Sequence, residues 1–184
     1  MSAVLEWLLS IDRSIILAVQ NIRVSWLTPI MCFFSFLGNG GIFWIALCLI
    51  LMLIKKYRKA AIISLIALLI CFLINNVALK LLVDRIRPYE TIPQLSVLIP
   101  LPSDASFPSG HACSSFAVAN ALFRNRKGKW EWCLYILAGL IAFSRIYVGV
   151  HYITDILGGI FIGLVFSSLT VWVLKNKIRW FADA

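Results

Sequence analysis

The sequence contains little charge and almost no histidine. Only 14% of its 184 residues are Asp, Glu, Lys or Arg, and only two, His111 and His151, are histidines. A soluble domain is excluded because 61% of the residues are hydrophobic and the mean hydropathy is +0.93, so such a domain would have to bury all of this apolar surface. Several apolar runs reach the roughly 20 residues that cross a bilayer. The composition therefore indicates an integral membrane protein.

Cysteine and acidic residues are too few and too scattered for a metal centre. The five cysteines lie in or beside apolar runs, and their odd number and spacing fit neither a metal pattern nor a disulfide framework. Two histidines and eight acidic residues form no ligand cluster either. We therefore expect no metal and no cofactor. The first ten residues contain no Lys or Arg, so a cleaved signal peptide is not expected.

The net charge of +9 does not indicate a nucleic-acid partner, because the basic residues gather at the ends of apolar runs. Eleven of the seventeen lie in residues 55–59, 124–129 and 175–179. The positive-inside rule accounts for all three clusters if they face the cytoplasm.

The hydropathy pattern predicts an all-α membrane bundle of about five to six transmembrane helices, with residues 1–184 forming a single membrane-embedded domain. Apolar residues recur every three or four positions between Val4 and Ile22, which predicts an amphipathic helix lying in the interface. Five prolines exclude a continuous helix over residues 84–108. The apolar runs expected to span are 31–54 (interrupted at 38–41), 60–82, 109–123, 130–148 and 152–174.

This topology brings an unusual set of polar residues to the outer ends of the spans. With the three basic clusters inside, Lys80, Arg85, Arg87 and Arg145 fall on the outer side, against the positive-inside rule. Ionisable groups at membrane depth are functional candidates. The same face receives Ser109, His111, His151 and Asp155.

The first constellation is Lys80 with Arg87. They are two helical turns apart and share a face if the helix persists, although Pro88 favours an end at Arg87. Arginine offers a planar fork to phosphate oxygens, and lysine offers a point charge. The alternative is an ordinary basic helix end paired with Asp84.

The second constellation is Phe107-Pro108-Ser109-Gly110-His111. Ser109 and Gly110 are expected to present backbone N–H groups at a helix N-terminus, which favours an anion, and His111 would stand beside it. The alternative is a capped helix with an interfacial histidine.

The third constellation is Ser144-Arg145 followed by His151 and Asp155. A carboxylate four residues after a histidine can hold one ring nitrogen and expose the other, which is the geometry of a nucleophile or base with its orienting group. Arg145 adds another fork for an anion. The alternative is a buried His–Asp pair that stabilises a helix end.

Taken in order, the three constellations resemble the signature of the type 2 phosphatidic acid phosphatase (PAP2) superfamily. The family motifs K-x6-RP, PSGH and SR-x5-H are matched without departure over residues 80–155. The resemblance implies an all-helical fold shared with acid phosphatases and vanadium haloperoxidases.

The resemblance also implies roles. His151 would attack phosphorus and form a phosphohistidine, Asp155 would orient it, and His111 would protonate the leaving oxygen and then activate water. No metal is required. Asp84 and Arg85 lie outside the fixed motif positions and are expected to support the site. The residues expected to hold the phosphoryl oxygens are Lys80, Arg87, Ser109, Gly110 and Arg145.

We therefore expect a metal-independent phosphatase of a membrane lipid phosphate or diphosphate. Its substrate would be of the undecaprenyl diphosphate, phosphatidate or phosphatidylglycerophosphate type, and its site would face the outside of a bacterial inner membrane. Oligomeric state stays open. One alternative is a lipid-phosphate-binding or transport protein without turnover, in which Asn could replace His151. Another is an oxidative enzyme using vanadate, which the membrane setting and small size disfavour.

Overall fold

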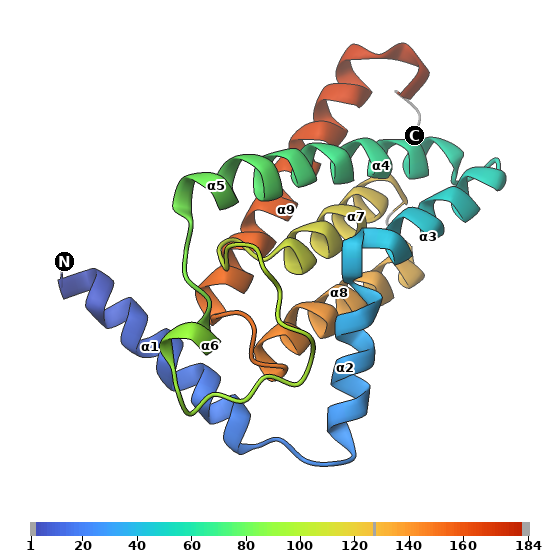
Figure 1. Ribbon diagram of the computed structural model, residues 1–184. Coiled ribbons are helices and arrows are strands. Elements are labelled where there is room, and N and C mark those ends of the chain that lie inside the picture. The colour runs from blue at the N-terminus through green and yellow to red at the C-terminus, as the bar shows by residue number, and fades with distance from the viewer. Residues whose placement is uncertain (1–2, 127, 182–184) are drawn as a thin grey trace.

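The computed structural model describes residues 3–126 and 128–181 and is entirely helical over them, without a strand, as predicted (Figure 1). Lys127, part of the second basic cluster, lies outside the described residues. The elements are α1 (Ala3–Asn21), α2 (Leu27–Leu37), η1 (Asn39–Gly41), α3 (Ile42–Leu53), α4 (Arg58–Phe72), η2 (Leu73–Leu79), α5 (Lys80–Val83), α6 (Pro88–Thr91), α7 (Gly110–Arg126), α8 (Lys129–Tyr147), α9 (Ile153–Lys177) and η3 (Arg179–Phe181).

The predicted interruption of the first apolar run is a bend between α2 and α3. The two helices meet at 50°. Gly40 and Gly41 have φ angles of 59° and 67°, a left-handed conformation that glycine adopts without steric cost. Ser35 and Asn39, on either side of the bend, both contact His111 of the site described below.

The second apolar run also departs from a regular helix. Between α4 and α5 the chain forms a π-helical turn, η2, a feature that is frequent at functional sites. The helix ends at Asp84, whose φ of 41° turns the chain out of α5. Lys80 and Arg87 therefore do not share one continuous helix. The helix ends before Arg87, the position at which Pro88 favoured an end.

Among the described helices, the most extensive contact joins α7 to α9. Two glycines of α9 allow it. A Cβ atom on Gly159 would lie 2.5 Å from the Ser109 carbonyl oxygen, and one on Gly163 would lie 2.6 Å from the Cys113 carbonyl oxygen. This close approach places the start of α7 directly against the start of α9.

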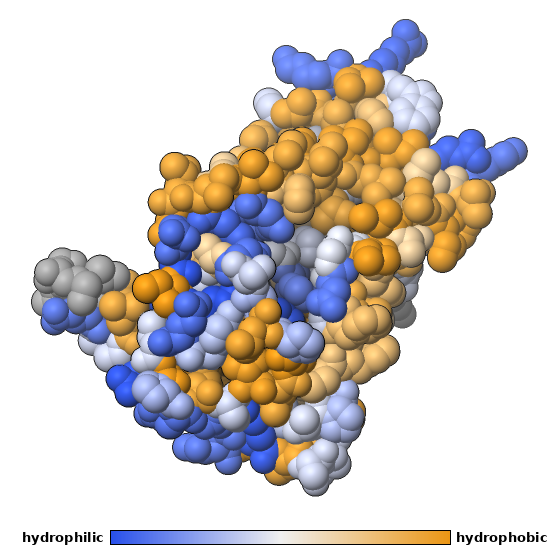
Figure 2. All heavy atoms as spheres, viewed as in Figure 1, coloured by the Kyte–Doolittle hydropathy of each residue, from blue (hydrophilic) through white to orange (hydrophobic). Residues whose placement is uncertain are grey.

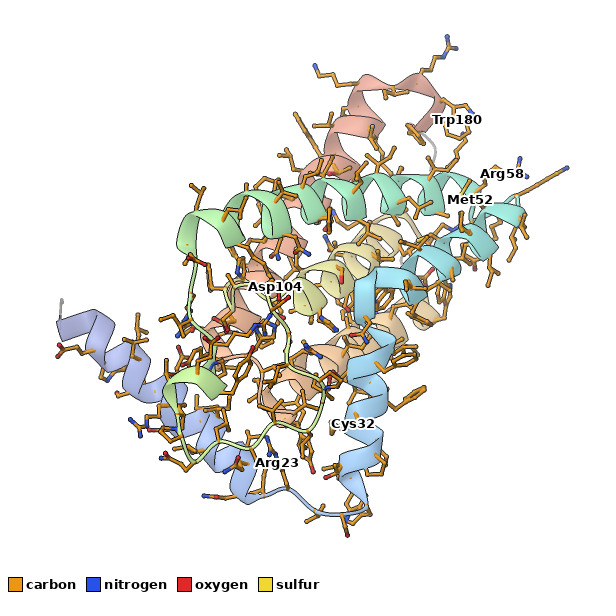
Figure 3. All side chains as sticks on the ribbon, in the orientation of Figure 1. Arg23, Cys32, Met52, Arg58, Asp104 and Trp180 are labelled. Atoms are coloured by element: carbon orange, nitrogen blue, oxygen red, sulfur yellow. The ribbon has the colours of Figure 1, made fainter. Side chains whose placement is uncertain are left out.

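The three basic clusters meet at one end of the bundle. The ammonium group of Lys59 lies over the Trp180 ring, and the Arg126 guanidinium lies over Tyr57. Tyr57 in turn packs against Trp130. Arg58 and Trp180 mark this end in Figure 3, while Arg23, at the end of α1, marks the other. The shared end is the arrangement that the positive-inside rule predicts.

Large apolar side chains cover much of the surface, and several charged side chains are buried in the interior beside the apolar core. Large apolar side chains such as Leu53, Leu81 and Phe161 are exposed, and Lys80, Arg87 and Arg145 are buried. Figure 2 shows the apolar cover over α3, α4 and α9, with hydrophilic residues gathered below α5. This distribution suits a lipid environment, because the exposed side chains replace water contacts with lipid contacts.

By length and composition, the stretches Arg58–Thr91 and Ile153–Lys177 could each cross a membrane, and the bent pair α2 and η1–α3 adds a third span if it counts as one. Among the other described helices, α7 has 17 residues, and α8 carries Glu131 and Arg145 within its 19 residues. That α7 and α8 also cross the membrane, which the expected total of five to six spans requires, therefore stays a prediction.

The close contact of α7 with α9 predicts a strong effect of a single methyl group. Gly163→Ala is expected to lower the free energy of unfolding in detergent by about 1–3 kcal/mol, because its Cβ would collide with the backbone of α7. Gly139→Ala in α8 is the control, since a Cβ there meets nothing within 4 Å. Tryptophan fluorescence during denaturation measures both variants, and equal stability would contradict the prediction.

Candidate active site

The signature residues meet in one cavity of about 840 Å³. It is enclosed by the α2–α3 bend, α4, η2, the start of α7 and the connection between α6 and α7. Ser109 and Asp155 are fully buried and lie next to the wall rather than in it. The signature residues that line the cavity are Lys80, Arg87, Gly110, His111, Arg145 and His151.

Lys80 and Arg87 converge on Asp104, which the sequence analysis did not single out. Arg87 donates from Nη2 to Asp104 Oδ1 at 2.6 Å and from Nε to the Asp104 carbonyl oxygen at 2.7 Å. Lys80 donates to Asp104 Oδ2. The expected alternative partner of Lys80, Asp84, is exposed instead. The two cations are thus brought together by Asp104 of the 92–109 connection, and not by lying on the same face of one helix.

Arg145 enters the cavity from α8 and is almost completely buried. Its Nη1 donates to the hydroxyl oxygen of Ser35 on α2. Its Nε is buried and has no hydrogen-bond partner. An unsatisfied guanidinium nitrogen is costly in an apolar interior, so this donor is available to an anion in the cavity.

The start of α7 differs from the sequence expectation at Ser109. Its backbone N–H is not free, because it donates to the Asp155 carbonyl oxygen at 3.0 Å. Its hydroxyl oxygen is the group without a partner, buried beside the cavity. Gly110 packs against Asn76 of η2, where a Cβ would lie 3.0 Å from Oδ1. The Ser109 amide is therefore not free for a ligand, and the unpartnered hydroxyl lies beside the cavity.

His151 lies in front of α9 and is held by Asp155. The distance from Nδ1 to Asp155 Oδ2 is 3.4 Å, a long contact of the kind that tightens in a reacting complex. The same carboxylate accepts hydrogen bonds from Ser106 Oγ at 2.5 Å and from the Tyr152 amide at 2.9 Å. Asp155 thus both caps α9 and contacts the His151 ring. The two residues are four apart in sequence, but His151 precedes the helix, so they do not lie on one helical face.

Arg85 connects this pair to α1. It donates from Nη1 to Asp155 Oδ1 and from Nη2 to Asp12 Oδ2, both at 2.6 Å. Asp12 is fully buried and also accepts from the amide and hydroxyl groups of Thr154. The supporting role expected for Arg85 therefore has a physical form, an alternating chain of charges from His151 to the N-terminal helix.

His111 is held by the α2–α3 bend. Its Nε2 lies 3.0 Å from Asn39 Oδ1 and 3.2 Å from the Ser35 carbonyl oxygen. Gly38 admits the ring, because a Cβ there would lie 2.5 Å from His111 Cδ2. The sequence marked residues 38–41 only as an interruption, and no spacing signal linked them to His111.

The electrostatics of two groups outside the spanning helices follow from these contacts. Burial, together with the charges of Arg145 and Arg87, lowers the pKa of His151 to about 4, although the hydrogen bond to Asp155 acts to raise it. The ring is therefore neutral at pH 7. Burial raises the pKa of Asp104, but the hydrogen bonds and charges of Lys80 and Arg87 outweigh it and lower that pKa to about 2.

A three-residue cluster of His, Cys, Asp or Glu that could hold a metal ion does not occur in residues 3–126 and 128–181. The described site offers nitrogen donors and hydroxyl groups, which suit an anion.

The family of the chain follows from its motifs and this fold together. The family model described as the PAP2 superfamily matches residues 60–179, more than half of the chain and all of the signature positions. The chain belongs to the PAP2 superfamily. An undecaprenyl-diphosphatase of Sulfolobus acidocaldarius is 33% identical over 152 residues, 82% of this chain and 72% of the relative.

A further relative and a solved structure extend the similarity over nearly the whole chain. Phosphatidylglycerophosphatase B of Bacillus subtilis is 33% identical over 184 residues, 94% of this chain and 87% of the relative. The crystal structure of a transmembrane PAP2 type phosphatidylglycerolphosphate phosphatase from Bacillus subtilis has a TM-score of 0.74 at 28% identity, covering 97% of this chain and 90% of that one. This PAP2 member is accordingly a phosphatase and a membrane protein.

The charge chain through Arg85 predicts that Asp12, far from the cavity, affects turnover. Asp12→Asn is expected to lower kcat at least about tenfold with little change in KM, because Arg85 then shifts and Asp155 no longer fixes His151. Glu6→Gln, an exposed acid on the same helix, is the control. Full turnover of Asp12→Asn in detergent micelles would contradict this coupling.

The lowered pKa of His151 predicts that its ring stays neutral in acid. In carbon-13 histidine-labelled His111→Gln protein, the one remaining imidazole is expected to keep a constant NMR shift from pH 8 to about pH 5, a unit above its pKa of about 4. A midpoint near the ordinary histidine value of about 6.5 would contradict it.

Proposed function

We propose that this phosphatase removes the terminal phosphate of a membrane lipid monophosphate or diphosphate, on the extracytoplasmic side, through a phosphohistidine. The observation that carries the proposal is a neutral, carboxylate-held His151 in a cavity lined by Lys80, Arg87 and Arg145. A nucleophile beside fixed cations is the arrangement that phosphoryl transfer requires, because charge spreads over the phosphoryl oxygens in the transition state.

In the first step, His151 attacks phosphorus through Nε2, since Nδ1 contacts Asp155. The nitrogen–phosphorus bond forms as the bond to the leaving oxygen breaks. The leaving oxygen takes a proton from His111, and the Asp155 carboxylate stabilises the charge on the His151 ring. The groups that hold the phosphoryl oxygens are Lys80, Arg87, Arg145, the Ser109 hydroxyl and the Gly110 backbone.

In the second step, water replaces the leaving group. His111, now unprotonated, accepts a proton from the water as the water attacks phosphorus and the bond to His151 breaks. Inorganic phosphate leaves, and both histidines return to their starting states. His111 depends on the α2–α3 bend for its position, so this step links the bend to turnover.

The apolar part of the same cavity supports a lipid substrate. Beyond the polar residues, the cavity continues between α3 and α4 along Ile45, Leu65, Leu68, Leu69 and Phe72. Leu69 and Phe72 are exposed on the outside of α4, so this part reaches the lipid-facing surface. The relatives named for undecaprenyl diphosphate and phosphatidylglycerophosphate support substrates of those types. Our proposal includes phosphatidate as a third lipid with a terminal phosphate.

The distribution of charge supports an extracytoplasmic site in a cell membrane, which we propose to be a bacterial inner membrane. The contacts that join Lys59 to Trp180 and Arg126 to Tyr57 lie away from the cavity, at the basic end of the bundle. With that end in the cytoplasm, the cavity opens towards the outer face.

The test is release of inorganic phosphate by the purified protein in detergent with EDTA. Undecaprenyl diphosphate, phosphatidate, phosphatidylglycerophosphate and a soluble phosphomonoester form the panel. We expect release from at least one lipid, and His151→Ala and His151→Asn are each expected to lower it by at least about a thousandfold, because the nucleophile is lost.

Melting curves of both variants establish that they are folded. Release that survives in folded His151→Asn would contradict the phosphohistidine. Folded wild-type protein that binds these lipids without releasing phosphate would instead support a binding or transport protein.

A further inference from the structure

Asp104 occupies the anion-binding groups of Lys80 and Arg87. Its two carboxylate oxygens accept from Lys80 Nζ and Arg87 Nη2, and its carbonyl oxygen accepts from Arg87 Nε. The remaining nitrogen, Arg87 Nη1, donates to the Val150 carbonyl oxygen at 2.8 Å. Every nitrogen of the Arg87 guanidinium is therefore engaged. Nη2 keeps a second N–H, but a phosphoryl oxygen can take the position that the carboxylate holds between Lys80 and Arg87 only if the carboxylate moves away.

Two other donors of the site are different. Arg145 Nε and Ser109 Oγ are buried and have no hydrogen-bond partner. Neither donor has a protein partner that an anion would have to displace. The donors of the site therefore fall into two groups: Arg145 Nε and Ser109 Oγ have no partner, whereas Lys80 and Arg87 already hold a carboxylate.

The carboxylate is placed so that it can leave. The Asp104 side chain is 55% exposed, while those of Lys80 and Arg87 are 8% and 3% exposed. Figure 3 places Asp104 near the middle of the viewed face, on the connection that crosses in front of α7. Its departure without a replacement would leave two buried cations unpaired, which is strongly unfavourable. The exchange therefore needs an incoming anion that gives these cations more charge than Asp104 does.

A terminal phosphate meets this condition, and a phosphodiester does not. A phosphate monoester near neutral pH carries close to two negative charges on three terminal oxygens. A phosphodiester carries one charge, as the carboxylate does, and competes with a group that is tethered to the site at high effective concentration. Phosphodiester headgroups are the form in which common membrane phospholipids carry phosphate, so they surround the cavity in excess.

We infer that Asp104 is a specificity-determining residue, an internal competitor that admits lipids with a terminal phosphate and rejects phosphodiester lipids. Discrimination of this kind relies on a group that opposes the wrong ligand. The inference rests on the proposed function, because it assumes that Lys80 and Arg87 bind the substrate phosphate.

The experiment compares Asp104→Asn with the wild type in mixed micelles. Hydrolysis of the best lipid substrate is measured while phosphatidylglycerol, a phosphodiester, is added. Half-inhibition of Asp104→Asn is expected at an about tenfold lower mole fraction of phosphatidylglycerol than for the wild type, since a neutral amide replaces a charge-assisted acceptor. Asp104→Glu retains a carboxylate and is expected to restore resistance to the phosphodiester.

Glu90→Gln is the matched control, because it removes the same charge from an exposed position on α6, next to the same connection. It is expected to behave as the wild type does. A second readout does not depend on turnover. Stabilisation by inorganic phosphate, measured as a rise in melting temperature, is expected to reach half its maximum at an about tenfold lower phosphate concentration in Asp104→Asn.

The outcomes separate the two proposals. Active Asp104→Asn with unchanged sensitivity to phosphatidylglycerol, or with weaker phosphate binding, would overturn the inference and leave the proposed function standing. Weaker binding would mean that Asp104 arranges Lys80 and Arg87 for the substrate instead of competing with it. A wild-type protein without turnover on any lipid would overturn both.

Discussion

The cost of burying cations governs this structure. Lys80, Arg87 and Arg145 are buried inside a bundle whose outer surface is apolar, and each cation removed from water costs several kcal/mol unless it is paired. The fold meets this cost with groups from distant segments. The 92–109 connection supplies Asp104, α2 supplies Ser35, and the turn before α9 supplies the Val150 carbonyl. The irregular segments are therefore placed by charge as much as by apolar packing.

A second set of paired charges supports His151. His151 contacts Asp155, Asp155 contacts Arg85, and Arg85 contacts Asp12. The Arg85 cation lies between the carboxylates of Asp155 and Asp12, so no charged member of this chain is left unpaired in a low dielectric. The last member belongs to α1, which makes the N-terminal helix part of the support of the site. The glycines of α9 complete this support, because the close contact with α7 sets Ser109 against the Asp155 carbonyl.

The sequence predicted the helices and the gathering of its signature residues well, because both depend on local signals. Apolar runs located α7 and α9 to within a few residues. The partners could not be predicted. Asp104, Ser35, Asn39 and Asp12 reach the site through a proline-rich connection, a glycine bend and a docked helix, whose paths depend on tertiary contacts. The same limit explains the error at Ser109, whose amide was expected to face a ligand and instead bonds to another helix.

The pairing of buried charges explains why some donors of the cavity have protein partners and others do not. At the start of α7 and on α8, donors are held by helices and are left without protein partners. Where the chain is a half-exposed connection, a carboxylate satisfies the cations until a ligand arrives. A site with every cation unpaired would destabilise the apolar bundle, and a site with every donor satisfied would resist its ligand. Placing the removable partner on the most accessible segment reconciles a stable fold with anion binding.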